Sequence, residues 1–360
     1  MAVSRINEAG LNVNQYGNRN LIINGAMQVA QRGTSSTGLG ATSGYYTVDR
    51  MSTAFNGTAG RLTMTQESIT DLPGFTKCVK LACTTADTSI AAAEYLIFSH
   101  NIEGQNLQQL AKGTSSAKKV TVSFYVKGNA AATYVCELQD NNSREISKSF
   151  SVTTDWTRVV LTFDGDTDSG GTIVNSNANG IGLIFWLHAG STFNSGNAGD
   201  LNTSWNAAGT GERAAGADSF FDSTSRTFFI TGVQMEVGDT ATDFEHRTFA
   251  DELLRCQRYF VRLGGVGRDY FVGGSNASFG YFSTDLPVQM RSTPSLSNNG
   301  GFTINNFAAA GTPTDIDVEL ASKNRFGFRT SGGVTYTLGN ALVFYEASTD
   351  SGNLKLDAEL

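Results

Sequence analysis

The chain has 360 residues, and its net charge of −7 and pI near 5.1 argue against nucleic acid as the main partner, because phosphate binding needs a basic surface. Only 16% of the residues are charged, whereas Gly occurs 40 times and Phe 23 times. This composition is typical of many short strands joined by tight turns, so the expected fold class is all-β.

Residues 1–19 are polar and show no hydrophobic periodicity. The segment is either a disordered tail or an extended arm that orders on a partner. As an arm it would attach the chain to a larger particle through Leu11, Val13 and Tyr16. No signal-peptide core follows Met1, and the longest apolar run, 183–187, is too short to span a bilayer, so membrane insertion is not expected.

From residue 20 the sequence changes to short apolar runs separated by Gly, Asn, Asp and Ser. The first run, Leu21-Ile22-Ile23, is predicted to be a strand that ends in the turn dipeptide Asn24-Gly25. Further strands are predicted at 60–65, 78–83, 94–99, 119–127, 133–138, 145–152, 157–163, 181–188 and 226–236. This spacing predicts a β-sandwich or barrel. The Gly-, Ser- and Asn-rich stretches 165–180 and 189–219 are expected to be surface loops.

One helix is predicted, over residues 248–263. Thr248 and Asp251 have the spacing of a capping box, and Gly264 follows the segment. A single apolar stripe is formed at helical spacing by Phe249, Leu253, Cys256 and Phe260. The stripe either packs on its own domain or forms a seam between copies in an oligomer.

Residues 264–360 return to β character, with strands predicted at 279–285, 301–306, 316–320, 324–330, 333–338 and 341–347. The predicted organisation is an arm at 1–19, a jelly-roll domain at 20–247, the linking helix at 248–263 and a smaller β-sandwich at 264–360.

Motifs for catalysis are absent from the sequence. There is no GxSxG, HExxH or GxxxxGK[ST] motif, and the chain is therefore not expected to be an enzyme. His100, His188 and His246 have no Asp, Glu or Cys at ligand spacing, so no metal site is predicted from them. A glycan hydrolase stays open as an alternative, since any two of the acidic residues could converge in the fold.

Two further groups are candidates for binding. Asp164, Asp166 and Asp168 alternate as in the start of a calcium loop, but Ser169 stands where such a loop needs Gly; a solvated turn is the alternative. No other cofactor is expected. Trp205 lies in a polar, Gly-rich segment, where it either anchors the loop or stacks on a sugar ring. Trp156 and Trp186 are expected to be buried against the sheets.

Several segments together resemble a family of phage tail-fibre and virion structural proteins. Two segments resemble the opening of that family's domain: Asn20-Leu-Ile-Ile-Asn-Gly-Ala-Met-Gln-Val-Ala-Gln-Arg-Gly33 and Tyr46-Thr-Val-Asp-Arg50. Three further segments resemble the family's closing strand and the residues after it: Phe229-Ile-Thr-Gly-Val-Gln-Met-Glu-Val-Gly238, Ala241-Thr-Asp-Phe-Glu-His-Arg247 and Asp251-Glu-Leu-Leu-Arg-Cys-Gln-Arg-Tyr259. The tail segments 286–294 and 356–360 are also similar to those of phage proteins.

The resemblance implies a jelly roll similar to carbohydrate-binding modules, and commonly a homotrimer. In those modules the opening continues Phe-Glu, and the acid helps to hold calcium; Ala26, Met27 and Gln28 stand there in this chain, so that site is not carried over. The resemblance implies a tail-fibre or receptor-binding component of the virion, assembled in the host cytoplasm. Its expected partners are other phage tail or virion proteins through the arm, and host-surface polysaccharide. The alternative is a head spike, decoration or tail-hub protein without receptor contact.

Overall fold

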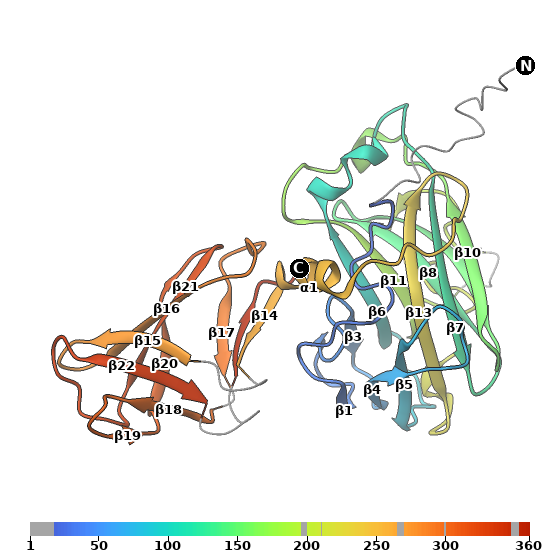
Figure 1. Cartoon of the computed structure of the whole chain (residues 1–360). Helices are drawn as coiled ribbons and strands as arrows, with labels where there is room; N and C mark the ends of the chain where they lie inside the picture. Colours follow the sequence, from blue (N-terminus) through green and yellow to red (C-terminus); the bar gives the residue numbers. More distant parts are fainter. Residues whose placement is uncertain (1–17, 196–199, 210, 265–269, 299, 347–352) are drawn as a thin grey trace, which may run out of the picture. The chain divides into compact units, whose positions relative to one another are not determined.

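The computed structural model describes residues 18–195, 200–209, 211–264, 270–298, 300–346 and 353–360. The chain divides into two compact units, one of residues 1–249 with residue 360 and one of residues 250–359 (Figure 1). In the described ranges every strand pair is antiparallel, and the predicted all-β sandwich class is confirmed.

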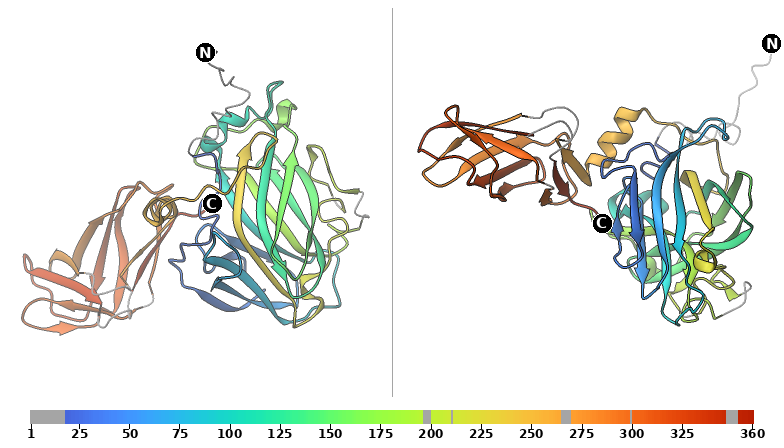
Figure 2. Two further views of the ribbon diagram at one scale, coloured as in Figure 1. Left: turned by 45° about the vertical axis from the view of Figure 1, so that its right-hand side comes forward. Right: turned by 90° about the horizontal axis from the view of Figure 1, so that it is seen from below.

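The N-terminal unit is a sandwich of two sheets (Figure 2). Sheet A contains, in spatial order, β1 (Ser35–Leu39), β4 (Arg61–Ser68), β5 (Lys77–Thr85), β13 (Thr227–Val237), β7 (Val120–Gly128) and β10 (Thr157–Phe163). Sheet B contains β12 (Asn206–Ala207), β9 (Arg144–Val152), β8 (Ala132–Asp140), β11 (Asn179–Ala189), β6 (Tyr95–Glu103), β3 (Ser52–Asn56) and β2 (Gly44–Tyr45). The connections include the short helices η2 (Gly104–Asn106), η3 (Gln108–Leu110), η4 (Ser169–Gly171) and η6 (Phe220–Asp222). All the strands predicted between residues 60 and 236 are present.

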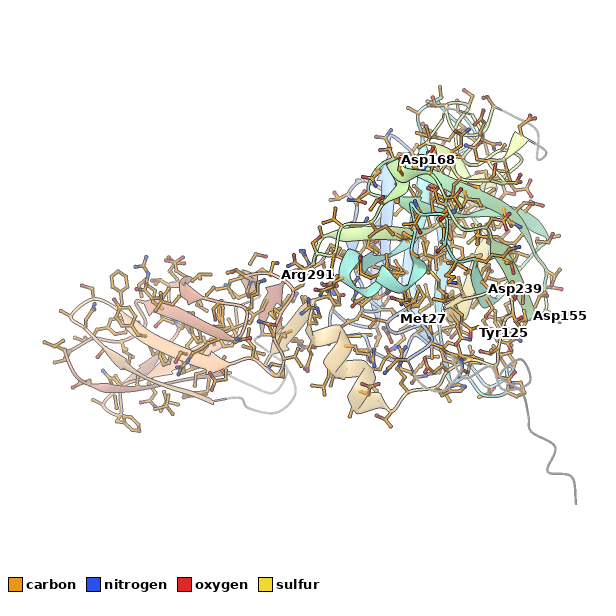
Figure 3. The ribbon with its side chains drawn as sticks, turned by 90° about the horizontal axis from the view of Figure 1, so that it is seen from above. Met27, Tyr125, Asp155, Asp168, Asp239 and Arg291 are labelled. Atoms are coloured by element: carbon orange, nitrogen blue, oxygen red, sulfur yellow. The ribbon has the colours of Figure 1, made fainter. Side chains whose placement is uncertain are left out.

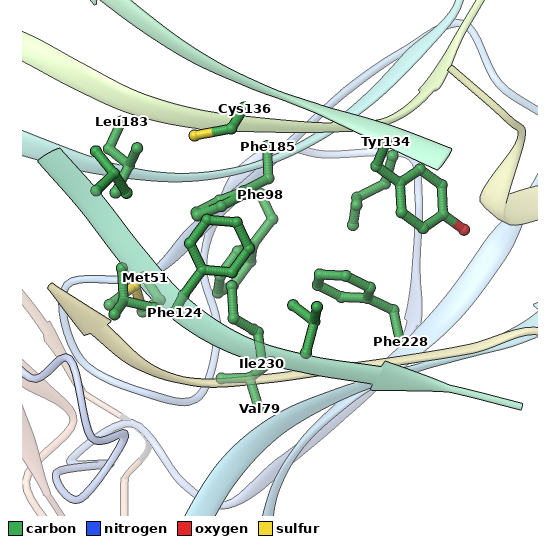
Figure 4. Packing of buried hydrophobic residues seen from close by; sticks show 14 of the residues in the cluster. Met51, Val79, Phe98, Phe124, Tyr134, Cys136, Leu183, Phe185, Phe228 and Ile230 are labelled. Carbon is green, nitrogen blue, oxygen red and sulfur yellow. The ribbon is translucent and has the colours of Figure 1, made fainter. Parts of the chain in front are cut away.

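The core lies between the two sheets and is rich in aromatic rings (Figure 4). Phe124 of β7 packs edge-on against Phe185 of β11 and Phe150 of β9, with ring centroids 5.0 and 5.1 Å apart. Edge-to-face contacts add to the free energy gained by burying the rings. Alternate residues of each strand supply this core, so their neighbours in sequence lie on the outer faces of the sheets.

The predicted first strand is wrong. Residues 21–23 form no ladder. The Leu21 amide donates to the Met235 carbonyl oxygen (2.9 Å), but the amides of Ile22 and Ile23 donate to side chains, Asn20 Oδ1 (2.9 Å) and His100 Nε2 (3.2 Å). Asn20 Oδ1 also accepts from the amide of Met235 (3.1 Å). The Asn24 side chain then bonds the backbone of Val29, and Asn24 itself has a φ of 62°. Side-chain bonds therefore replace strand pairing at this point.

The C-terminal unit has two sheets around one core. The first contains β14 (Phe260–Leu263), β23 (Leu354–Asp357) and β17 (Ser295–Asn298). The second contains β19 (Ala310–Gly311), β18 (Phe302–Asn305), β22 (Ala341–Glu346), β15 (Tyr270–Ser275), β16 (Gly280–Asp285), β21 (Arg325–Ser331) and β20 (Asp315–Ala321). The strand predicted at 333–338 is absent, since those residues form bends and a turn.

The helix is shorter than predicted. It is α1 (Phe249–Gln257), and residues 260–263, expected to be its last turn, form β14 instead. The amide of Tyr259 closes a turn on Cys256 (2.9 Å), and the following run pairs with β23 near the end of the chain. A partner strand about a hundred residues away thus overrides the local helical pattern. In the described part of the chain, no helix has the length and apolar character to cross a bilayer.

Candidate functional site

One row of side chains crosses the outer face of sheet A. Phe229 of β13 lies opposite Lys80 of β5 on one side and Lys127 of β7 on the other. Trp156 directly precedes β10, whose first residue, Thr157, pairs with Val126 of β7. The row therefore alternates cation and ring. We call Lys80, Phe229, Lys127 and Trp156 the aromatic row.

The side chains of the aromatic row contact one another. The Lys127 ammonium lies 5.0 Å from the ring centroid of Trp156 and 5.1 Å from that of Phe229. The Trp156 indole N–H donates to Asp71 Oδ1 at 3.0 Å, and Lys127 pairs with the other oxygen of Asp71. These hydrogen bonds from Lys127 and Trp156 lower the pKa of Asp71. At neutral pH the row thus ends at an ionised, half-exposed carboxylate.

The neighbouring part of this face is covered by the connection between β4 and β5. Phe75 from that connection packs on Tyr125 of β7 with 5.3 Å between ring centroids; Tyr125 is labelled in Figure 3. Both rings lie on Gly232 of β13, where the ladder with β7 changes register. A Cβ at Gly232 would come within 3.0 Å of both rings, and its φ of 62° also favours Gly. Trp156 and Phe229 remain only partly buried at the edge of this cluster.

The aromatic row offers the chemistry of a sugar-contacting surface. Half-buried rings present apolar faces for the C–H side of a pyranose, and Lys and Asp beside them supply hydrogen-bond donors and acceptors for hydroxyl groups. Sequence reasoning placed Trp156 against a sheet but missed this face. The four side chains come together only through the register of β5, β13, β7 and β10. No single segment of the sequence therefore carries a signal for the aromatic row.

The outer face of sheet B is closed by the chain's own residues. The segment after β11, predicted to be a surface loop, packs on this face and buries Leu201, Ala214 and Ala215 there. Trp186 is 1% exposed beneath it and packs with Tyr95 and Phe193. In its described part the segment 189–219 is mostly loop, as predicted, but it is not wholly at the surface, because small apolar residues hidden among Gly and Ser form a third layer on sheet B.

Two carboxylates converge under this layer. Glu137 and Glu145 are both fully buried, and Arg213 contacts both, at 3.0 Å and 2.7 Å through its Nε. The Trp186 indole N–H also donates to Glu137 (3.1 Å). Burial and the neighbouring Glu137 raise the pKa of Glu145 to about 8. The pair has the composition of a hydrolase site but is enclosed by protein, and its charge is balanced by Arg213.

Trp205 anchors its loop. Its indole N–H donates to the carbonyl oxygen of Asp164 (2.7 Å), and the ammonium of Lys112 lies 4.0 Å from its ring centroid. Trp205 is partly buried against the main core. Trp205 therefore packs on the core between the sheets, whereas Trp156 packs in the cluster on the outer face of sheet A; this position favours anchoring over sugar contact for Trp205.

The three aspartates proposed as a calcium loop do not form one cluster. Asp166 is buried and bonds Lys112 (2.8 Å) and Arg144 (2.7 Å). Burial opposes its ionisation, but Arg144 and Lys112 outweigh that effect and hold the pKa of Asp166 at about 2. Asp164 instead pairs with Lys119 at the surface, and Asp168, labelled in Figure 3, caps η4. Because protein cations already occupy both oxygens of Asp166, these residues do not fit a calcium ion.

The segments that resemble phage proteins meet at one end of the sandwich and hold it closed. Glu245 accepts from the amide of Asn20 (2.9 Å), and Arg247 donates to the carbonyl oxygens of Asn20 and Ile22. Gln234 accepts from the amide of Glu245 (2.8 Å). These motif residues act within the fold, tying the start of the domain to the segment after β13.

The proposed helix stripe is only partly realised. Phe249 is 59% exposed, Leu253 is partly buried and Cys256 is fully buried, while Phe260 lies on β14. The four residues therefore do not share one helical face. Leu11, Val13 and Tyr16 lie outside the described residues.

The three histidines do not meet. His100 Nε2 accepts the amide of Ile23 (3.2 Å), and His246 packs on Phe75 and Phe244. His188, interpreted from the sequence as a strand-end side chain, is the second-last residue of β11 and lies beside Asp87 and Glu94. Sequence spacing missed this cluster because its members come from the ends of different strands.

Comparisons with known proteins identify no family. No protein-family model matches the chain, and no curated protein matches it significantly. Solved structures similar to it include the enzymatically active domain of tailspike protein 4 of bacteriophage CBA120, with a TM-score of 0.31 and 11% identity. That match covers 61% of this chain and 21% of the tailspike chain.

Two carbohydrate-binding modules are also similar. TmCBM61 in complex with β-1,4-galactotriose has a TM-score of 0.30 and 10% identity, over 61% of this chain and 99% of the module. The family 11 module of a Clostridium thermocellum cellulosomal cellulase has a TM-score of 0.26 and 11% identity, over 63% and 97%. At these values the likenesses carry no argument about the function of this chain.

Proposed function

We propose that the chain is a non-catalytic structural protein of a tailed-phage particle that attaches it to host-surface glycan, as a tail-fibre or receptor-binding component. The observation that carries the glycan-binding part is the aromatic row, with Trp156 and Phe229 partly exposed beside Lys80, Lys127 and Asp71. Aromatic faces flanked by charged hydrogen-bonding groups suit pyranose rings. Each such contact is weak, and several copies in one particle multiply them.

The phage part of the proposal rests on the sequence segments at 20–33, 46–50 and 229–247. Their residues hold the domain closed, as the bonds of Asn20, Glu245 and Arg247 illustrate. In this proposal the arm at 1–19 joins the protein to other virion proteins, and the assembled form is a homotrimer. Nucleic acid has no part in it.

The test is the binding of assembled full-length protein to immobilised bacterial surface polysaccharides. Trp156→Ala removes the indole of the aromatic row, and Trp205→Ala is the matched control, because the Trp205 ring packs within its own loop. We expect Trp156→Ala to weaken binding about tenfold or more per site, equivalent to about 1.4 kcal/mol. Trp205→Ala should leave affinity unchanged in folded protein.

Either of two results would overturn the site. If both variants bind like the wild type, the glycan contact lies elsewhere; if only Trp205→Ala loses affinity, the loop of Trp205 is the binding surface. If the properly assembled wild type binds no surface polysaccharide or host cell, receptor attachment itself is wrong.

The second candidate is a particle-building role without receptor contact, as a head spike, decoration or tail-hub protein. The specific observation in its favour is an apolar groove of the C-terminal unit, lined by Val272 and Leu320, which are each more than 70% exposed. Large exposed apolar patches mark protein interfaces. Incorporation into particles without any adhesion to host cells would favour this role.

A further inference from the structure

A second cluster of ionisable side chains lies at the end of the N-terminal sandwich where β5 ends. Asp87 stands in the connection from β5 to β6, Glu94 directly precedes β6, and His188 is near the end of β11. β6 and β11 are hydrogen-bonded neighbours, with Ala189 opposite Tyr95, so the pairing itself brings Glu94 and His188 together. The ladder shifts register between Trp186 and His188.

The three side chains have the geometry of a metal-ligand set. One ligand atom from each lies within 4.8 Å of the others, and His188 Nε2 is 3.7 Å from Glu94 Oε2. Zinc binds nitrogen and oxygen at about 2.0–2.2 Å, so tetrahedral ligand atoms are about 3.4 Å apart. Small side-chain movements would close this cluster on one ion.

The two atoms that face each other lack hydrogen-bond partners. Glu94 Oε2 and His188 Nε2 are buried, and neither finds a donor or acceptor within the described residues. The residues are 7% and 0% exposed, and Asp87 is 5% exposed. Unsatisfied buried polar atoms cost roughly 1–3 kcal/mol each, so two of them aimed at the same point indicate a missing ligand.

No protein cation balances this cluster, in contrast to the other buried acidic pairs. Glu137 and Glu145 have Arg213, and Asp140 and Asp166 share Lys112. In the described part of the chain, neither Asp87 nor Glu94 pairs with a Lys or Arg; their ionisable neighbour is His188. Burial first, and then the nearby Asp87, raise the pKa of Glu94. A bound cation would remove that repulsion.

The outer contacts of the cluster orient it for metal binding. Asp87 Oδ2 accepts from the Thr58 hydroxyl (2.8 Å) and the Ala59 amide (2.7 Å), which leaves Oδ1 with a single weak contact to the Ser89 amide. His188 Nδ1 bonds the Ser219 hydroxyl (2.8 Å), so Nε2 is the nitrogen that points into the cluster. A second ring bond of this kind fixes the orientation of metal-ligating histidines.

We propose that Asp87, Glu94 and His188 bind one divalent transition-metal ion, and that Zn²⁺ fits the site best. An imidazole with two carboxylates is a nitrogen–oxygen set suited to zinc, whereas calcium takes six to eight oxygens. The ion ties the β5–β6 connection to the end of β11, beside the segment that closes sheet B. Its role is structural, since the ligands are buried. This site is independent of the aromatic row and of the glycan-binding proposal.

The experiment uses the full-length chain, freed of metal with a chelator and then titrated calorimetrically with Zn²⁺, Ca²⁺ or Mg²⁺. We expect one equivalent of Zn²⁺ to bind and to raise the melting temperature, and Co²⁺ to give the visible absorption of a low-coordinate site. Ca²⁺ and Mg²⁺ should bind at least about tenfold more weakly. Glu94→Gln and His188→Gln should each reduce Zn²⁺ affinity at least tenfold.

Glu67→Gln is the matched control, because Glu67 is a surface carboxylate paired with Lys80. It should bind Zn²⁺ like the wild type. Circular dichroism of each metal-free variant shows whether it is folded; Glu94→Gln removes a buried charge and should fold without metal.

Folded wild type that takes up no Zn²⁺ overturns the proposal and leaves a carboxylate pair that shares a proton. Undiminished Zn²⁺ binding by folded Glu94→Gln and His188→Gln also overturns it, by placing the ion elsewhere, and tighter Ca²⁺ than Zn²⁺ binding excludes the transition-metal assignment.

Discussion

The N-terminal unit covers much of the outer faces of its two sheets with its own chain, whereas the C-terminal unit leaves several large apolar side chains exposed to solvent. In the first unit, Trp186 on sheet B and Phe75 on sheet A are both less than 10% exposed. In the second, Val272 and Leu320 are 71% and 77% exposed, and they line a groove of about 560 Å³ together with Phe282 and Phe328.

The difference shows where each unit obtains its stability. The first unit uses long connections, such as the segment after β11, as additional layers, and it pairs the buried Glu137 and Glu145 with its own Arg213. The second has short connections and a smaller core, so its outer faces stay open. Exposed apolar side chains on an edge strand, such as β20, favour association with another chain. Four predictions test this contrast.

The largest effect is expected from ending the chain at residue 352. This removes β23, which is the central strand of its sheet and pairs with both β14 and β17. Leu354 and Leu356 are fully buried, so their loss opens the core of the C-terminal unit. Calorimetry should lose the unfolding transition of residues 250–359 and keep that of the first unit. Full-length Leu338→Ala, at a 78% exposed position, should keep both; a truncated chain that does so contradicts the assignment.

The second prediction concerns the closed face of sheet B. Arg213→Ala leaves Glu137 and Glu145 buried without a cation, which should lower the free energy of unfolding of the N-terminal unit by about 3–5 kcal/mol. Lys119→Ala is the control, because its pair with Asp164 is exposed and should be worth less than about 1 kcal/mol. Denaturant titration measures both. Equal, small losses would mean that the layer over sheet B contributes little to stability.

The sequence predicted the strands well wherever an apolar run stood alone. Strands such as β10, predicted over its whole length, carry their pattern locally. The pattern misled where a distant partner decides the conformation: Phe260 continues a helical stripe but pairs with Asp357. It also failed at residues 21–23, where the amides of Ile22 and Ile23 bond the side chains of Asn20 and His100 and not a partner strand.

The candidate sites were less accessible to prediction than the fold. Phe229, Lys127 and Trp156 are far apart in sequence and meet only through strand register. Asp87 and His188 likewise meet only once β6 and β11 pair. Asp166 was interpreted as part of a calcium loop or of a solvated turn, but it is buried between Lys112 and Arg144, and these partner cations carry no spacing signal.

The third prediction concerns the two buried carboxylates under the layer over sheet B. The folded pKa of Glu145, about 8, lies above its unfolded value of about 4.3. The folded state therefore binds the Glu145 proton more tightly than the unfolded state does. The stabilisation of the folded state by this proton is fully present below about pH 4 and is lost as the pH rises through 8. Gln cannot ionise, so the stability of Glu145→Gln relative to the wild type should increase by about 4 kcal/mol between pH 5 and 9, because each pH unit between 5 and 8 costs the wild type about 1.4 kcal/mol. Urea unfolding at both pH values measures it, with surface Glu67→Gln as control; a pH-independent difference would show that Glu145 does not titrate in this range.

The smallest effect on stability, and the most direct test of the contrast, is expected from Leu320→Lys. Leu320 lies on β20, the edge strand of its sheet, and is 77% exposed, so the free energy of unfolding should change by no more than about 0.5 kcal/mol. A lysine at an apolar edge opposes pairing with another chain, and the predicted homotrimer should therefore dissociate, as measured by light scattering after size-exclusion chromatography. Leu338→Lys is the control, because Leu338 is equally exposed but does not line the groove. If the wild type is monomeric, or if Leu320→Lys assembles like Leu338→Lys, this groove is not the self-association surface, and the open faces of the second unit need a partner other than a copy of the chain.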